Sequence, residues 1–185
     1  FRGVDGVIDD LSRHLLRLPG ESAAALLPRR AGCLPQTFPV LARVPVLQQA
    51  PPPAAGDPRE RRAALFSALR ELLQRLADRG PLILHIDYLQ WAGPDSLALL
   101  EHVLAPPDAP PLLLLATCRR DAPPPLPGAP ETSETLDLGP LADPDAAALA
   151  RELTRTRGST TAELVLASGG HPLFLRELAS APAGS

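Results

Sequence analysis

The sequence predicts an α/β fold in which helices cover the faces of a parallel sheet, with a helical segment after the sheet. Two apolar runs, 82–87 (LILHID) and 112–117 (LLLLAT), have the length and near-continuous hydrophobicity of buried parallel strands. A helical pattern at 95–104 lies between them, as expected for a strand–helix–strand unit. After Gly139-Pro140 the pattern is helical only, which predicts a separate helical part at the end of the chain.

The first 56 residues are predicted to be helical and to end in a linker. The apolar residues of 4–18 fall mostly on one helical stripe, and 21–27 has the pattern of a second, short helix. Residues 31–49 also look helical, but prolines at positions 35, 39 and 45 break the pattern into pieces. Residues 49–56 (QAPPPAAG) predict a stiff, proline-rich linker.

The clearest helix of the sequence begins after Asp57. Asp57 can cap it, Pro58 suits its first turn, and Glu60 completes a capping box. Leucines then recur every three or four residues on one side, at positions 65, 69, 72 and 76. Gly80 predicts the end of the helix, because glycine is common just past the last turn.

Weaker signals complete the pattern. Asp95 or Ser96 is expected to cap the helix at 95–104, and Thr135–Leu138 favours a third strand after a proline-rich loop at 121–133. The helices expected in the final part cover 143–157, 160–167 and 172–180.

The composition excludes several function classes. The net charge is −3, so the chain lacks the basic footprint of nucleic-acid binding, and its longest apolar stretches, 81–86 and 111–118, are too short to span a bilayer. Cys33 and Cys118 form neither metal-ligand spacing nor a disulfide framework, which favours a reduced, cytoplasmic setting. All 18 basic residues are arginine, so a phosphate-binding loop of the G-x-x-x-x-G-K-[ST] type cannot occur within these residues. The chain begins at Phe1 and holds no methionine, so we expect it to be part of a longer protein.

Two charged residues follow the predicted strands, and ligands of open α/β sheets bind at the carboxyl ends of strands. Asp87 directly follows the first run, where a carboxylate could hold Mg²⁺, directly or through water, beside a phosphate chain; alternatively, it begins a turn. Arg119 lies two residues beyond Thr117, where a guanidinium could contact a terminal phosphate; alternatively, it is a solvated arginine beside Arg120.

A third candidate lies in the segment SGGHPLFLREL, residues 168–178. Gly169-Gly170 is predicted to end one helix, and Pro172 suits the first turn of the next. His171, just before that turn, could approach a nucleotide base or phosphate; the alternative is a structural histidine in a turn.

Taken together, these segments resemble the STAND class of AAA-related P-loop NTPases, the signal-transduction ATPases with numerous domains. The resemblance is carried by IDYLQW (86–91) followed by PDS, by LLLLATCR (112–119) and by GGHPLFLREL (169–178). In that family the Walker B strand ends in D-D-L-Q-W, a later strand ends in A-T-x-R, and a helical lid carries G-x-P-L-[FY]-L. The segments GVDGVIDDLSRHLLRLP (3–19), PRRAGCLPQTFPVLARV (28–44) and 57–87 are similar to the helical insert and helix that precede Walker B. This version of the ATPase region is familiar from bacterial proteins that join a serine/threonine kinase domain to the ATPase and to tetratricopeptide repeats.

The resemblance implies a nucleotide site for ATP and Mg²⁺. Asp87 would be the Walker B carboxylate that holds Mg²⁺, and Arg119 the sensor arginine. Pro172 would be the lid proline near the adenine, with His171 beside it, while Gln90 and Trp91 would be signature positions. The implied organisation is a helical insert with a linker (1–56), a core ATPase segment with the Walker B and sensor strands (57–140), and the start of a helical lid (141–185).

Two departures from the family pattern bear on activity. Tyr88 stands where the second Walker B acid is expected, and a phenol is a poor general base at neutral pH, so hydrolysis is not expected from this chain alone. The Walker A strand and loop are also absent from these residues, and by analogy we expect them upstream of Phe1. The sheet would then expose an edge, which is an aggregation hazard.

Three hypotheses for function remain open at this point. The first is a regulatory ATP-binding switch that passes its state to fused signalling domains. The second is a degenerate ATPase fold that serves as a scaffold or an oligomerisation module, so homo-oligomerisation stays open. The third assigns the activity to a fused kinase domain, because these residues hold no HRD-type or DFG-type segment.

Overall fold

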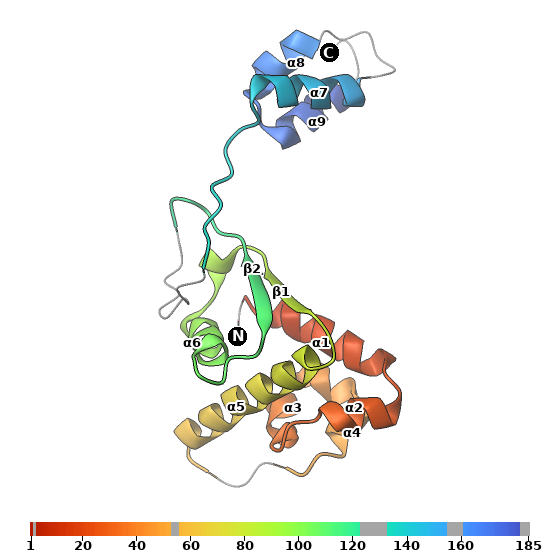
Figure 1. Cartoon of the computed structure of the whole chain (residues 1–185), viewed down its shortest axis with the longest axis vertical. Helices are drawn as coiled ribbons and strands as arrows, with labels where there is room; N and C mark the ends of the chain where they lie inside the picture. Colours follow the sequence, from red (N-terminus) through yellow and green to blue (C-terminus); the bar gives the residue numbers. More distant parts are fainter. Residues whose placement is uncertain (2, 53–55, 123–132, 155–160, 182–185) are drawn as a thin grey trace. The chain divides into compact units, whose positions relative to one another are not determined.

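The chain forms two compact units, residues 1–134 and 135–185 (Figure 1). The computed structural model describes residues 1, 3–52, 56–122, 133–154 and 161–181. Parts of the predicted linker, of the proline-rich loop and of the helices expected at 143–157 and 160–167 therefore lie outside the described residues.

The beginning of the first unit is a series of short helices, as the sequence predicts. α1 (Asp5–Arg17) buries Ile8, Leu11 and Leu15 on one side, and α2 (Gly20–Leu26) follows it. The chain continues as η1 (Ala31–Cys33), α3 (Leu34–Thr37), η2 (Pro39–Arg43) and α4 (Pro45–Gln48), where η denotes a 3₁₀ helix. A proline occupies the first or second position of α3, η2 and α4, which confirms the predicted breaks.

The longest of the predicted helices is α5 (Pro58–Ala77), and its start is confirmed in detail. The Asp57 carboxylate accepts from the Glu60 N–H at 2.8 Å, and the Glu60 carboxylate accepts from the Asp57 N–H at 3.2 Å. The end predicted just before Gly80 is confirmed to within two residues, because the helix stops at Ala77 with Asp78 as its C-cap. The last turn tightens, with bonds from Arg79 N–H to the Leu76 carbonyl and from Gly80 N–H to the Ala77 carbonyl, so α5 stops at Ala77.

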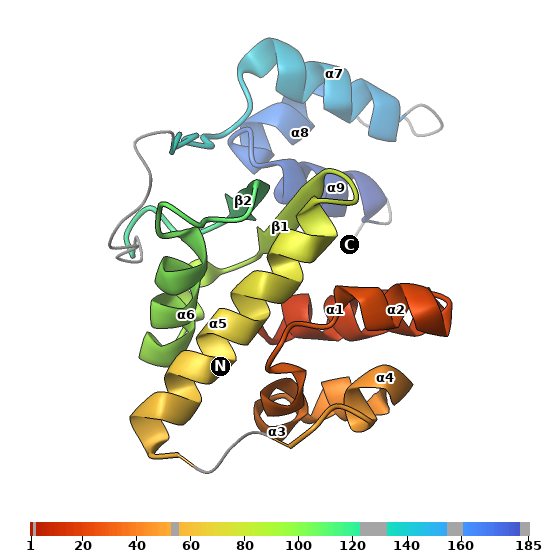
Figure 2. The same ribbon diagram turned by 60° about the horizontal axis from the view of Figure 1, so that its bottom comes forward.

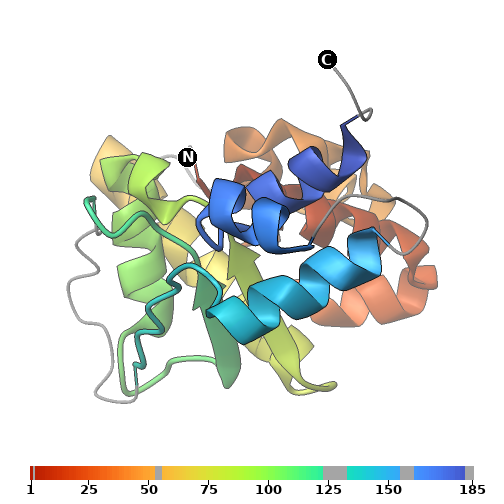
Figure 3. The same cartoon turned by 90° about the horizontal axis from the view of Figure 1, so that it is seen from above.

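The predicted parallel sheet is confirmed in part, as one pair of strands among the described residues. β1 (Leu82–Ile86) and β2 (Leu112–Ala116) pair in parallel, with Ile86 opposite Ala116. The connection between them contains η3 (Leu89–Trp91) and α6 (Pro94–Leu104), a crossover of the kind that parallel strands require. In Figure 3, β1 and β2 lie side by side with their carboxyl ends at the same edge.

The start of α6 differs from the prediction. α6 begins at Pro94 after Gly93, and neither Asp95 nor Ser96 caps it. The Asp95 carboxylate instead forms an ion pair with Arg62 at 3.0 Å, and Ser96 is buried. A proline at the first helical position leaves one fewer N–H to satisfy, so the helix starts without a side-chain cap.

One apolar core joins the first 56 residues to the rest of the first unit. Leu34, Leu41 and Leu47 of the short helices belong to the same buried cluster as Leu72 of α5 and Leu99 of α6. Figure 2 shows α5 running between α6 on one side and α1 to α4 on the other. Residues 1–56 and the helices and strands up to residue 116 therefore share one core.

The third strand expected at Thr135–Leu138 does not form. Residues 133–142 contain neither helix nor strand, and Leu136 and Leu138 are exposed. A strand requires a neighbouring strand to pair with its N–H and C=O groups, and no described segment pairs with this one. Alternation of apolar and polar residues was therefore not enough to produce a strand here.

The second unit is a small helical body made of α7 (Asp143–Leu153), α8 (Thr161–Ser168) and α9 (Pro172–Ser180). Its core is small and contains alanines and leucines, namely Ala146, Ala150, Leu164, Leu175 and Ala179. Gly170 adopts φ +76, and a Cβ there would lie 2.5 Å from the Leu141 carbonyl oxygen, so the turn before α9 needs glycine. No helix in the described ranges is both long and apolar enough to cross a membrane.

The outer face of the β1–β2 pair leads to a first prediction. Ile83, Leu113 and Leu115 are 60%, 58% and 52% exposed, and β2 has no second strand partner among the described residues. We expect the double substitution Leu113→Glu and Leu115→Glu to reduce self-association of the isolated chain, because charge on an exposed strand opposes edge pairing. Sedimentation velocity over a concentration series measures this. Leu16→Glu, at an exposed leucine of α1, is the control, and an equal effect of that substitution would show that the sheet is not responsible.

Candidate functional site

The candidate site begins where β1 and β2 end side by side. Because Ile86 lies opposite Ala116, the next residues, Asp87 and Thr117, meet at the carboxyl edge of the sheet. The Thr117 hydroxyl donates a hydrogen bond to the Asp87 carboxylate. The Thr117 N–H donates to the Ile86 carbonyl at 3.0 Å, and the Thr117 carbonyl accepts from the Leu89 N–H at 2.8 Å. Thr117 thereby fastens the loop after β1 to the end of β2.

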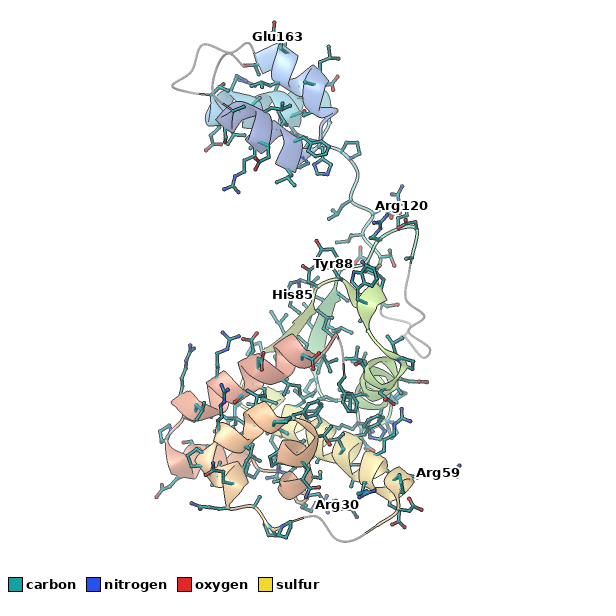
Figure 4. The ribbon with its side chains drawn as sticks, turned by 180° about the vertical axis from the view of Figure 1, so that it is seen from behind. Arg30, Arg59, His85, Tyr88, Arg120 and Glu163 are labelled. Atoms are coloured by element: carbon teal, nitrogen blue, oxygen red, sulfur yellow. The ribbon has the colours of Figure 1, made fainter. Side chains whose placement is uncertain are left out.

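Tyr88 gives this loop its sharp turn. Its backbone is left-handed, with φ 57 and ψ 51, and its N–H donates to the Thr117 hydroxyl oxygen at 3.0 Å. Its side chain is 57% exposed, and Figure 4 shows it at the end of the strands. The turn sends the chain into η3, where Leu89 is buried and anchors the loop in the core. The loop is therefore fixed at both ends while the ring of Tyr88 faces solvent.

The left-handed backbone at Tyr88 predicts a stabilising substitution. Tyr88→Asn is expected to raise the free energy of unfolding by about 1 kcal/mol, because asparagine tolerates this conformation better than a residue with a bulky side chain. Urea denaturation followed by circular dichroism measures the change. Tyr88→Phe removes only the hydroxyl group and should leave stability unchanged. A lower stability of Tyr88→Asn would mean that the exposed ring contributes more than the backbone strain costs.

Arg119, the second candidate, is held by a neighbour. Its guanidinium forms a two-pronged ion pair with Asp121, with distances of 2.9 Å from Nε and 2.7 Å from Nη2. Both side chains are exposed. The hydrogen bond from Arg119, with its positive charge, lowers the pKa of the Asp121 carboxyl, and the same bond raises the pKa of Arg119. An anion that binds Arg119 would therefore compete with Asp121 for the guanidinium.

The signature positions after β1 differ in their surroundings. Trp91 is exposed, whereas both amide atoms of Gln90 are buried and find no hydrogen-bond partner among the described residues. Burying an amide group without hydrogen-bond partners costs about 1–3 kcal/mol of folding free energy. The Gln90 amide could therefore accept a partner that the described residues do not supply.

His171 and Pro172 belong to the second unit. Pro172 occupies the first turn of α9, as the sequence predicts, and His171 is the residue just before the helix. The His171 ring stacks on Phe174, with ring centroids 4.5 Å apart and planes inclined by 27°. The imidazole is thus oriented by an aromatic contact rather than by a charged group.

The structure brings together some of the candidate residues and reveals others. Asp87 lies against Thr117, and Arg119 lies against Asp121. Sequence reasoning placed Asp87 and Arg119 at strand ends but missed the roles of Thr117 and Asp121. The signal for Thr117 was the pairing register, because in parallel strands of equal length the residues after each strand lie side by side.

A family model described as AAA ATPase domain matches residues 4–115, which is more than half of the chain. The chain belongs to this family. Neither a curated protein nor a solved structure matches it. The AAA ATPase domain match supports a P-loop NTPase type of α/β fold and an ATPase-type module, and the family generally binds ATP with Mg²⁺.

The residues at the strand ends of this AAA ATPase domain fit a Mg²⁺ ion that arrives with phosphate. Mg²⁺ prefers hard oxygen ligands and is usually held by one or two carboxylates together with phosphate oxygens and water. Asp87 supplies such a carboxylate, exposed and oriented by Thr117. The described residues contain no group of three His, Cys, Asp or Glu side chains that could hold a metal ion without other ligands. A single oriented carboxylate thus suits an ion whose other ligands are phosphate oxygens and water.

Proposed function

We propose that this AAA ATPase domain is a regulatory ATP-binding module in which Asp87 contacts the Mg²⁺ that accompanies the triphosphate. The observation that carries the proposal is the contact of Asp87 with Thr117 at the carboxyl edge of two parallel strands. This is the edge at which α/β sheets bind ligands, and it lies within the residues that match the family or directly after them. Bound Mg²⁺ would neutralise part of the phosphate charge.

The side chains of the domain have separate tasks in this proposal. Thr117 orients the Asp87 carboxylate through its hydroxyl group, so the carboxylate needs no rearrangement when it meets the ion. Arg119 would act as a sensor, because its guanidinium, which pairs with Asp121, could hold a phosphate oxygen instead. Pro172 and His171 at the start of α9 would contact the adenine, which gives the helical part from residue 141 the role of a lid.

Slow turnover or none is expected from this arrangement. Tyr88 occupies the position of a second acid, and its ring faces solvent, so no carboxylate directly follows Asp87 to activate a water molecule. The 185 residues hold no lysine, so a Walker A lysine would have to come from beyond this sequence. The resemblance of residues 86–91, 112–119 and 169–178 to the STAND class supports placing the domain among those switches. We extend the proposal to a bacterial, cytoplasmic protein with fused signalling domains such as a serine/threonine kinase.

Titration of the full-length protein that contains these residues with a fluorescent ATP analogue tests the proposal. We expect saturable binding that weakens when EDTA removes Mg²⁺, and little or no phosphate release. Tyr88→Glu is expected to increase phosphate release without tightening binding, because it supplies a carboxylate general base. If the full-length protein shows no affinity for the analogue with Mg²⁺ present, the domain is a scaffold or oligomerisation module instead. Gel filtration with and without ATP then shows whether it forms a homo-oligomer.

A further inference from the structure

A groove of about 880 Å³ lies in the first unit, between the start of α5 and the segment around η1. Its walls come from Arg29 to Thr37 on one side and Glu60 to Leu65 on the other, with Pro51 and Pro52 at one end. Figure 4 shows Arg30 and Arg59 at the end of this unit that lies away from Tyr88. The groove is therefore distinct from the edge of the sheet where Asp87 lies.

The lining of the groove is strongly basic. Arginines 29, 30, 61 and 62 line it, against the two carboxylates of Glu60 and Asp95. The chain as a whole carries a net charge of −3, so this concentration of arginine is a local feature and not a reflection of composition.

Both carboxylates of the groove already have partners. Glu60 accepts from the Asp57 N–H in the capping box, and Asp95 pairs with Arg62 at 3.0 Å. Arg62 also lies over the Phe66 ring, 5.1 Å from its centroid, which holds the guanidinium in place. Arg29 is also paired, with Glu71 at 3.5 Å. Of the four arginines in the lining, Arg30 and Arg61 are therefore the ones to consider for a ligand.

Arg30 and Arg61 have no ion-pair partner within the part of the chain that the structure describes. Both are exposed, and they come from opposite walls of the groove. A guanidinium presents its N–H groups in a planar fork that matches a carboxylate. The two arginines thus offer separate positions for negatively charged groups along one groove.

Much of the remaining surface of the groove is apolar, although the polar side chains of Gln36 and Thr37 also line it. Pro51, Pro52, Ala64 and Leu65 line it beside the arginines, together with the buried Cys33. Proline side chains are rigid and lack an N–H group, so this part of the wall suits CH₂ groups and apolar side chains rather than further hydrogen bonds.

We propose that the groove binds an extended acidic peptide segment of a partner protein, with carboxylates at Arg30 and Arg61 and an apolar side chain against the prolines. The volume is too large for a single phosphate group, and the mixture of separated arginines with an apolar wall matches a chain that carries both acidic and apolar side chains. A nucleic acid is disfavoured by the overall negative charge of the chain. This proposal does not depend on nucleotide binding.

Fluorescence anisotropy with a labelled peptide tests the proposal. The probe is a fluorescein-labelled peptide made of repeated Glu-Glu-Leu units. Its affinity should fall as the NaCl concentration rises, because salt screens exposed charges. The double variant Arg30→Gln and Arg61→Gln is expected to weaken binding by about tenfold, as two exposed charge pairs are lost. The matched control, Arg17→Gln with Arg43→Gln, removes the same charge from exposed arginines outside the groove and should change binding by less than about twofold.

Three results would overturn the proposal. These are an absence of peptide binding, whether or not pyrophosphate binds in the groove, an equal loss in the control variant, and a tighter complex with an oligothymidine than with the peptide. Circular dichroism of each variant shows whether it folds. If the double variant does not fold, Arg61→Glu alone replaces it, and unchanged affinity in that variant counts equally against the groove.

Discussion

The Leu72→Ala variant is expected to lose about 3 kcal/mol of unfolding free energy, because a buried leucine that becomes alanine loses its transfer energy and leaves a cavity. Leu72 is 0% exposed on the inner side of α5. It belongs to the cluster that also contains Leu34 of α3 and Leu99 of α6, so α5 connects the short helices to the strand–helix–strand unit. The loss should therefore affect the whole first unit and not one helix alone.

Urea denaturation monitored by circular dichroism measures the effect. The matched control is Leu16→Ala, which removes the same atoms from an exposed position of α1 and should change stability by no more than about 0.5 kcal/mol. A change of similar size in both variants would show that the cluster does not form one cooperative core. The same would follow if Leu72→Ala left the denaturation midpoint unchanged.

The Asp87→Asn variant is expected to weaken Mg²⁺-dependent binding of a fluorescent ATP analogue to the full-length protein by about tenfold. Asparagine keeps the size of the side chain and can still accept the hydrogen bond from Thr117, so the loop after β1 should keep its structure. What is lost is the negative charge that would contact the ion. Binding measured in EDTA should be the same for the variant and the native protein.

Asp108→Asn is the control for this experiment. Asp108 is an exposed aspartate in the loop before β2, so its substitution removes the same charge without altering the edge of the sheet. Affinity that is equally reduced in both variants would indicate a general effect of charge. Affinity unchanged in Asp87→Asn would remove the metal-binding role from Asp87 and leave the family membership untouched.

Local signals in the sequence were sufficient for most helices. The capping box of Asp57 and Glu60 fixed the start of α5, and Pro172 fixed the start of α9. Prolines divided the segment 31–49 into the observed pieces. Such signals succeed because capping and proline geometry act within a few residues, so they depend little on what lies elsewhere in the fold.

The predictions that failed depended on neighbours that a local pattern does not reveal. Thr135–Leu138 alternates like a strand but has no strand to pair with among the described residues. Asp95 has a side chain that can cap a helix, but its carboxylate forms an ion pair with Arg62 of α5 instead. In both cases tertiary contacts, or their absence, decided the structure.

In the candidate site, too, features set by local sequence could be predicted, and features set by tertiary contacts could not. The position of Asp87 at the end of a strand follows from the apolar run that precedes it, and the structure agrees. The pairing of Arg119 with Asp121 and the missing partners of Gln90 could not be predicted, because each depends on the path of a loop.

Thr117 joins the two strand ends through one residue. Its hydroxyl group, N–H and carbonyl all bond to the segment from Ile86 to Leu89. The residue that orients the Asp87 carboxylate is therefore also the one from which the chain continues towards Arg119. A substitution at this one position would disturb the surroundings of both candidate residues together.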